Sequence, residues 1–417
     1  MMPIVAERRG PPASDTARCA VSRQLLYTAG PDSHRQLDQT MVDEAAAPRP
    51  RIMVVLFSPS WLGAARLPGA LTHAGFSVAS YCHPESYLSK TRYNEYAFTA
   101  PTTGSAFPNL VASVRQYQPL FLIPACELAV RFFLNIIAAD AHGQVHAQFA
   151  DVVDLVRRSL GEPAFHQAML SKIEAHAVVE QLGLRAPEKR VVQCQADATD
   201  FGDAYGYPLV LKGEYGHAGN AVRICATAAE AIAAYSDLGG SAEGQRILVQ
   251  RYIRGVVVTQ SSVALAGQVL ETVTLVKHLT HPAPMGPSSV LRWVENPEAE
   301  QATRALLNES GYSGFSAANF IIEHETDAAY FIEFNPRVTP PCTVAGLFGR
   351  DLCRALWCQL SGVAYERQVL AHYPETVALF PNEWLRDPHS PYLTQGHHDV
   401  PWDDPTLLKA YVNGFVV

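Results

Sequence analysis

The chain has 417 residues, of which 48% are hydrophobic, so it is long enough for two or three domains with a sizeable core. Its 32 basic and 40 acidic residues give a net charge of −8, which argues against a nucleic-acid or anionic-membrane partner because such binding needs a basic surface. Eight cysteines without a CxxC pair favour reduced thiols in a cytoplasmic protein, and no apolar run approaches the roughly 18 residues of a membrane span.

Residues 1–50 lack a periodic apolar pattern and are rich in Pro, Ala, Arg and Asp, which is typical of a disordered tail. The early arginines are not followed by an apolar stretch of about 7–15 residues, so the sequence does not predict a secretory signal. Because ordered pattern begins only at Arg51, we hypothesise that Met41 is the native start.

Three apolar runs, at 51–57, 76–81 and 119–124, predict buried strands with helical segments between and after them. Strands that alternate with helices form a parallel sheet, so residues 51–145 are expected to make a small parallel α/β domain. No GxGxxG follows the first run, which argues against a dinucleotide-binding fingerprint. Glu127 follows the third run, where ligands of open α/β sheets tend to bind, although a capped helix start is the simpler interpretation.

A helical linker is expected over 146–190. Residues 165–182 are rich in Ala, Leu, Glu and Lys, and Gly183 stands where the C-cap of a helix is expected. Lys172 lies in this segment, where most lysines are simply solvated.

A predicted strand at 207–212 ends in Lys212 and is followed by Gly213, Gly216 and Gly219. Glycines let backbone N–H groups approach and fold over phosphates, and the lysine supplies a point charge. No GK[ST] follows, so the segment is not a Walker motif. A glycine-containing hairpin loop is the alternative.

Further strands are predicted at 247–253, 259–264 and 269–276, and a proline-rich loop follows the last of them. Lys277 and Arg292 are the cationic residues around this loop. Each is either a solvated surface charge or a group that holds a phosphoryl or carboxylate anion.

The segment 314–337 predicts an antiparallel hairpin with a polar turn. Because successive side chains of a strand point to opposite faces, Glu333 and Asn335 share one face. A three-residue turn at 326–328 would pair Asn319 with Asn335 on that face. One carboxylate and two amide oxygens suit magnesium, but an ordinary buried hairpin whose polar residues face water is equally consistent with the pattern.

The run from Phe331 to Arg337, F-I-E-F-N-P-R, resembles the metal-binding strand of the ATP-grasp superfamily, the fold shared by biotin carboxylase and D-alanine–D-alanine ligase. The resemblance covers roughly residues 51–365. It implies an α/β protein with the ATP-grasp fold, in which two α+β lobes surround the nucleotide and a small parallel α/β domain precedes them. The small lobe would span 191–253 and the large lobe 254–365, followed by a C-terminal extension over 366–417.

The resemblance also implies which residues form the site. The nucleotide phosphates would be contacted by Lys172, Lys212 and Gly216. The adenine edge would pair with the hinge residues Gln250, Arg251, Tyr252 and Ile253. The metal ligands would be Asn319, Glu333 and Asn335.

Three positions depart from the pattern of the superfamily. Gln250 stands where relatives usually have Glu, and Val257 stands where they often have a carboxylate for the ribose. Ile321 is expected to face Glu333, where many relatives have Asp or Glu. Asn319 shares that face but brings no charge, so one of two magnesium ions is expected to bind weakly or to be missing.

The implied activity is that of an ATP-dependent, ADP-forming ligase that activates a carboxylate as an acyl phosphate and joins it to an amine, most plausibly of an amino acid. ATP and Mg²⁺, or Mn²⁺, would be its cofactors. Arg337, Lys277 and Arg292 would hold the transferring phosphoryl group or the acyl carboxylate. A thiol or bicarbonate acceptor is one alternative, and a non-catalytic nucleotide-binding module is another.

Overall fold

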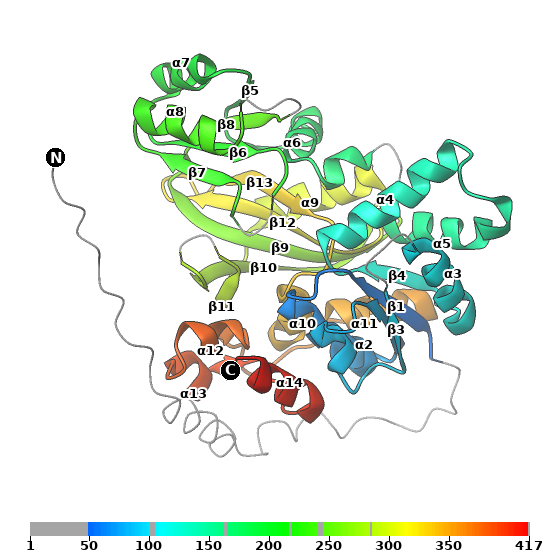
Figure 1. Ribbon diagram of the computed structural model, residues 1–417. Helices are drawn as coiled ribbons and strands as arrows, with labels where there is room; N and C mark the ends of the chain where they lie inside the picture. The colour runs from blue at the N-terminus through cyan, green and yellow to red at the C-terminus, as the bar shows by residue number, and fades with distance from the viewer. Residues whose placement is uncertain are drawn as a thin grey trace.

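The structure is a computed structural model, and it describes residues 49–100, 105–161, 165–216, 219–240, 245–283 and 286–415. The tail expected over 1–50 lies outside the described residues except for its last two positions. The described residues form three β-sheets with helices packed on them (Figure 1). Within the described part, each helix is too short or too polar to cross a lipid bilayer.

The first sheet is parallel and has the order β3-β2-β1-β4. Its central strand β1 is buried from Ile52 to Leu56, because helices cover both faces. This confirms the predicted small parallel α/β domain and adds the short strand β3, whose partly exposed residues carry little apolar pattern. The elements are β1 (Arg51–Leu56), α2 (Leu67–Ala74), β2 (Ser77–Cys82), β3 (Tyr96–Thr99), α3 (Ala106–Tyr117), β4 (Phe121–Pro124), α4 (Glu127–Ala141) and α5 (Ala150–Leu160).

The second sheet is antiparallel, with the order β5-β8-β6-β7, and is labelled at the top of Figure 1. Helices α7 and α8 pack together on it around Phe201, Leu211 and Val249. Helix α6 leads into this small lobe. The elements are α6 (Lys172–Gln181), β5 (Lys189–Val192), α7 (Gln195–Tyr205), β6 (Leu209–Gly213), β7 (Val222–Cys225), α8 (Ala228–Asp237) and β8 (Ile247–Arg251).

The third sheet has seven strands in the order β13-β12-β9-β10-β11-β14-β15. Strand β10 continues to Thr280, so Lys277 lies on a strand and not in the loop that the prolines predicted. The elements are β9 (Gly255–Leu265), β10 (Gln268–Thr280), β11 (Ser288–Trp293), α9 (Pro297–Ser310), β12 (Gly314–Glu323), β13 (Ala329–Asn335), α10 (Pro341–Val344), α11 (Leu352–Ser361), β14 (Thr376–Ala378) and β15 (His397–His398).

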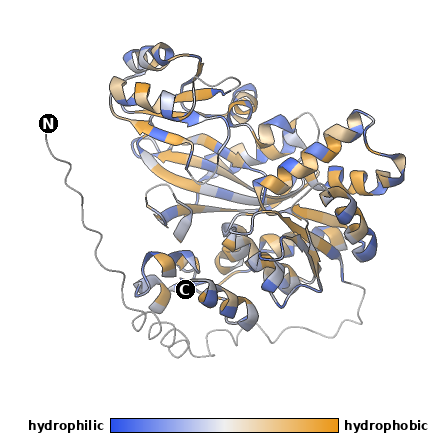
Figure 2. Cartoon of the chain, in the orientation of Figure 1, coloured by the Kyte–Doolittle hydropathy of each residue, from blue (hydrophilic) through white to orange (hydrophobic). Residues whose placement is uncertain are grey.

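One apolar core joins the first domain to the third sheet. It contains residues of β1, β4 and α5 together with residues of β9, β10 and α11. Figure 2 shows the apolar strands of both sheets inside the molecule, with polar residues on the outer helix surfaces. The shared core fixes the first domain against the strands that carry the predicted metal ligands.

The C-terminal segment adds strand β14 to the third sheet and then packs against the first domain. Tyr411 is fully buried, and its hydroxyl donates a 2.7 Å hydrogen bond to the carbonyl of Leu62. Asp404 accepts hydrogen bonds from Thr91 and from the backbone of Arg92. The helices are α12 (Asn382–Arg386), α13 (Pro391–Thr394) and α14 (Pro405–Phe415). This segment therefore bridges two domains.

Candidate active site

The hairpin of β12 and β13 places Asn319 directly opposite Glu333 and Ala317 opposite Asn335. The predicted pairing of Asn319 with Asn335 is therefore wrong. The turn is centred earlier than 326–328, since the backbone N–H of Glu323 bonds to the carbonyl of Ala328, and a bulge follows Asn319. The net shift of the register is two residues, and an even shift leaves each side chain on its predicted face.

The same register overturns the prediction that Ile321 faces Glu333. Ile321 pairs with Tyr330, on the turn side of the bulge. The residue opposite the Glu333 carboxylate is Asn319, which is buried and brings an amide oxygen to the pair. Glu333, Asn335 and Asn319 thus lie together as oxygen donors on one face of the hairpin.

Arg337 is held by contacts from two domains. Its Nη2 lies 3.1 Å from Asn335 Oδ1 and 3.0 Å from Glu127 Oε1, and its guanidinium stacks 4.7 Å from the centre of the Trp61 ring. Asn335 in turn donates a 2.7 Å hydrogen bond to Glu333 Oε1. This chain of bonds orients the predicted ligands and leaves only the remaining N–H donors of Arg337 for a substrate.

Two of the residues that orient Arg337 come from the first domain. Trp61 follows β1, and Glu127 begins α4 just after β4. The position of Glu127 after a parallel strand is a signal in the sequence, whereas Trp61 carries no such signal. Nothing in the local pattern links either residue to Arg337, which lies more than 200 positions further along the chain.

Lys172 at the start of α6 and Lys212 on β6 both reach the site. Lys172 Nζ donates to the carbonyl of Gly216 at 2.9 Å, and Lys212 Nζ lies 3.4 Å from the carbonyl of Ile332. Both side chains are at least nine-tenths buried. The ammonium groups therefore lie next to the predicted glycine loop and the strand that carries Glu333.

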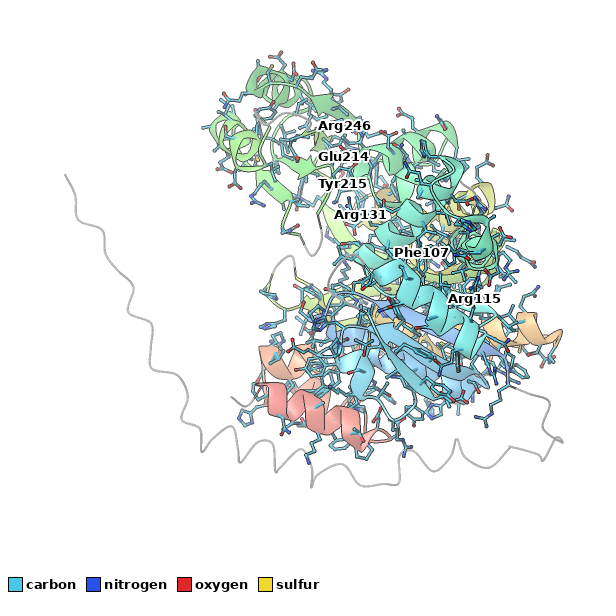
Figure 3. All side chains as sticks on the ribbon, turned by 45° about the vertical axis from the view of Figure 1, so that its right-hand side comes forward. Phe107, Arg115, Arg131, Glu214, Tyr215 and Arg246 are labelled. Atoms are coloured by element: carbon cyan, nitrogen blue, oxygen red, sulfur yellow. The ribbon has the colours of Figure 1, made fainter. Side chains whose placement is uncertain are left out.

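The start of α6 is tied to the loop after β6. Ser171 caps the helix by accepting from the backbone of Glu174 at 3.2 Å, and its hydroxyl donates to Glu214 Oε1 at 2.6 Å. Arg246 forms an ion pair with the same carboxylate. Figure 3 shows Arg246 and Glu214 close together, with Tyr215 next to them. These bonds fix Lys172 relative to the loop.

Tyr215 also joins the loop to the first domain. Its half-exposed ring lies under the guanidinium of Arg131 from α4, at 5.7 Å from the ring centre (Figure 3). The loop that follows Lys212 is thus attached both to the small lobe and to the first domain. His217 and Ala218 of this loop lie outside the described residues.

Charge compensation determines the ionisation of the site. Burial raises the pKa of Glu333, but the charges of Lys277 and Lys172 outweigh this effect, so its pKa lies below the usual value. Burial lowers the pKa of Lys277, although Glu333 opposes the shift. Burial lowers the pKa of Lys212 to about 8, with Glu333 again opposing. The site therefore holds an ionised carboxylate among three amines.

These groups surround a cavity of about 470 Å³. It is large enough for a small-molecule ligand, and its walls combine polar groups with valine, proline and tryptophan side chains. The predicted site residues that line it are Lys172, Lys212, Gly216, Lys277, Asn319, Glu333, Asn335 and Arg337. Other lining residues include Trp61, Gly255, Val256, Val257, Thr259, Pro287, Ile332, Pro340 and Pro341.

The hinge residues do not line this cavity. Gln250 is 1% exposed, and its Nε2 lies 2.9 Å from Nε2 of the buried His176. Arg251 forms an ion pair with Glu188 instead. Tyr252 and Ile253 are likewise absent from the lining, although the chain enters the cavity wall two residues later at Gly255.

Arg292 is also separated from the cavity. It pairs with Val276 on the neighbouring strand, whereas Lys277 is the next residue of that strand. Because alternate side chains of a strand point to opposite faces, Arg292 and Lys277 lie on opposite faces of the sheet. The structure brings Lys277 to Glu333 and keeps Arg292 away.

Comparisons with known proteins fit this geometry. Residues 171–353 match the family described as "Carbamoyl-phosphate synthase L chain, ATP binding domain". The matched region contains Lys172 of α6, the small lobe and the hairpin of β12 and β13. The chain has the ATP-grasp fold, and residues 171–353 are similar to an ATP-binding domain of that superfamily.

The solved structures of other ATP-grasp proteins share its fold. Biotin carboxylase from Campylobacter jejuni has a TM-score of 0.57 and 15% identity, over 76% of this chain and 72% of the other. The biotin carboxylase domain of 2-oxoglutarate carboxylase from Hydrogenobacter thermophilus has a TM-score of 0.55 and 16% identity, over 77% and 71%. L-amino acid ligase from Bacillus licheniformis has a TM-score of 0.52 and 15% identity, over 75% of each chain.

A curated relative matches at the level of sequence. The carbamoyl phosphate synthase large chain of Rubrobacter xylanophilus is 24% identical over 243 residues, which is 56% of this chain. This ATP-grasp chain spans only 22% of the length of that relative. The similarity therefore concerns the ATP-grasp portion and not the whole of the larger protein.

Proposed function

We propose that the protein is an ATP-dependent ligase that activates a carboxylate as an acyl phosphate and joins it to an amine, releasing ADP and phosphate. The observation that carries this proposal is the cavity in which Glu333 lies among Lys172, Lys212 and Lys277, with Arg337 on the same wall. Such a site suits a polyanionic nucleotide next to a second, carboxylate-bearing substrate.

The triphosphate of ATP would lie against Lys172 and Lys212, with the backbone of the loop around Gly216 covering it. Phosphoryl transfer depends mainly on positioning and on electrostatic stabilisation, which buried ammonium groups supply. We retain residues 250–253 as the proposed contact for the adenine edge, because this segment runs directly into Gly255, which lines the cavity.

Glu333, Asn335 and Asn319 would hold Mg²⁺ or Mn²⁺. The donors fit such an ion because they are hard oxygen ligands and the carboxylate is ionised. Within the described residues, no group of three or more His, Cys, Asp or Glu side chains could hold a metal. The proposed ligand set combines a single carboxylate with two amide oxygens. The bound ion would supply positive charge next to the β- and γ-phosphates.

The remaining cations would act on the acid substrate. A carboxylate oxygen attacks the γ-phosphorus, the bond from phosphorus to the ADP oxygen breaks, and an acyl phosphate forms. Lys277 and Arg337 would hold this anion. The amine then attacks the carbonyl carbon, phosphate leaves, and the nitrogen loses a proton, which gives the amide.

A second candidate uses bicarbonate as a substrate. The structure of the 2-oxoglutarate carboxylase domain contains MgADP and bicarbonate, and that protein has the same fold. The third possibility is a nucleotide-binding module without catalysis. The residue opposite Glu333 is Asn319 and not Ile321, so the second carboxylate that many relatives have there is still missing. Val257 remains on the cavity wall without a carboxylate for the ribose.

The decisive experiment measures ADP release by the full chain with ATP and Mg²⁺ against a panel of acids paired with amines, thiols or bicarbonate. ADP release that requires both an acid and an amine, with the amide found by mass spectrometry, is the expected result. ADP release with bicarbonate alone would favour the second candidate. Tight ATP binding with no ADP release under any pairing would overturn the ligase proposal.

A further inference from the structure

A second cavity, of about 330 Å³, lies beside strand β10 of the third sheet, beyond the end of β11, and shares no lining residue with the first. It is formed where β11 ends and the chain turns into α9, next to residues 272–274 of β10. Its lining includes Thr272, Thr274, Trp293, Glu295, Glu300 and Arg350.

The floor of this cavity is a stretch of open sheet edge. Strand β11 ends at Trp293, opposite Leu275, so none of the described strands pairs with β10 at 272–274 on that side. The N–H of Thr272 bonds to Glu271 Oε1 at 2.8 Å, and the carbonyl of Thr274 accepts from Val294 at 3.1 Å. Since the N–H and C=O of one strand residue point to the same side, Thr272 C=O and Thr274 N–H face the open edge.

The guanidinium of Arg350 also lines this cavity. Arg350 is 17% exposed, and its guanidinium lies 3.7 Å from both Glu271 and Glu295, which is longer than a hydrogen bond. Glu271 is 1% exposed and already accepts two 2.8 Å hydrogen bonds from Arg367. Because Arg367 balances the charge of Glu271, Arg350 can bind another anion.

The cavity is also lined by an exposed carboxylate, that of Glu295. Glu295 is 71% exposed, and within the described part of the chain its ion-pair partner is Arg350 at 3.7 Å. Glu300, in contrast, is bound by Arg304 at 2.8 Å within the same helix. A ligand that brings its own carboxylate to Arg350 would leave the Glu295 carboxylate for a cationic group.

We propose that this cavity binds a zwitterionic α-amino acid. Its carboxylate would bind Arg350, its ammonium group would bind Glu295, and the open edge at Thr272 and Thr274 would supply a backbone acceptor and donor. Trp293 gives one wall an aromatic surface, so amino acids with larger apolar side chains should bind more tightly. The proposal concerns a second site and does not depend on the ligase activity.

The test titrates a panel of L-amino acids into the full chain by isothermal calorimetry, in the absence of nucleotide. The matching carboxylic acids without the amino group serve as comparison ligands. We expect leucine and phenylalanine to bind, Arg350→Gln to weaken their binding by at least about tenfold, and Glu295→Gln to weaken it without affecting the deaminated acids. Lys277→Gln, which alters the first cavity, should leave this binding unchanged.

Two results would overturn the proposal. One is the absence of amino-acid binding at concentrations up to about 10 mM. The other is binding that survives Arg350→Gln and Glu295→Gln but disappears with Lys277→Gln, which would place the amino acid in the first cavity. Thermal melting of each variant checks its fold, and the exposed Glu295 decides the question if Arg350→Gln is destabilised.

Discussion

Asn319 lies directly opposite Glu333 on neighbouring antiparallel strands, and both side chains line the larger cavity. A carboxylate here faces an amide and not a second carboxylate. This single relationship gives the proposed metal site one formal charge and makes Asn319 the position where that charge can be altered without changing the fold.

Asn319→Asp should strengthen the binding of Mn²⁺ in the absence of nucleotide. A second carboxylate next to Glu333 adds a charged hard ligand, and a gain of roughly tenfold is expected. Electron paramagnetic resonance of Mn²⁺ titrated into the wild type and the variant measures the free ion directly. Equal affinities in the two proteins would show that the ion binds elsewhere.

Glu333→Gln should reduce ATP-dependent ADP release by about a hundredfold or more, because the only carboxylate of the proposed ligand set is lost. Circular dichroism should show an intact fold. Glu325→Gln, in the exposed turn of the same hairpin, is the matched control and should retain full activity. Normal turnover by Glu333→Gln would rule out the assigned site.

The lowered pKa of Lys212 should make nucleotide binding depend on pH. Its pKa of about 8 in the free protein means that it loses its charge as the pH rises above that value, so affinity for ATP should fall above about pH 8. The folded-state pKa lies below that of an unfolded lysine, so this group alone makes the ligand-free protein more stable as the pH rises from about 8 toward 10.5.

The variant Lys212→Arg separates this effect from other titrations. An arginine stays charged throughout the range, so the decline in ATP affinity near pH 8 should disappear or move to higher pH. Fluorescence titration with a nucleotide analogue between pH 6.5 and 9.5 gives the profile. A decline that is identical in the wild type and the variant would assign it to another group, for which Lys277→Arg is the next test.

Lys277 and Arg292 should respond differently to the same substitution. Lys277→Gln removes a cation from the cavity and should lower turnover by about tenfold to a hundredfold, whereas Arg292→Gln lies on the other face of the sheet and should leave turnover within about twofold of the wild type. Parallel measurements of kcat/KM compare the two. A larger loss from Arg292→Gln would contradict the observed faces of the sheet.

Gly255 should tolerate no side chain. A Cβ atom at this position would lie 2.1 Å from the carbonyl oxygen of Ile322 on the paired strand, so Gly255→Ala should lower the free energy of unfolding by about 2 kcal/mol. Gly346→Ala is the control, because its nearest neighbour would lie at 3.8 Å. Chemical denaturation of both variants measures the difference.

The sequence by itself determined much of the metal strand. Alternation along β13 is a local property, so Glu333 and Asn335 had to share a face whatever their partners. The apolar run before Lys212 is a local signal too, and it predicted strand β6, which extends one residue further to Gly213. The predicted register failed by an even number of residues, and this is why the predicted cluster survived while the expected neighbour, Ile321, did not.

Only the tertiary structure decided which distant groups meet this strand. Trp61 and Glu127 reach Arg337 because the first domain and the third sheet share one core, and no local pattern encodes that packing. The strand pairing of β10 and β11 likewise put Lys277 in the cavity and Arg292 outside it. Side-chain alternation is set by the backbone of a single strand, whereas partners and register depend on contacts between segments that are far apart in the chain.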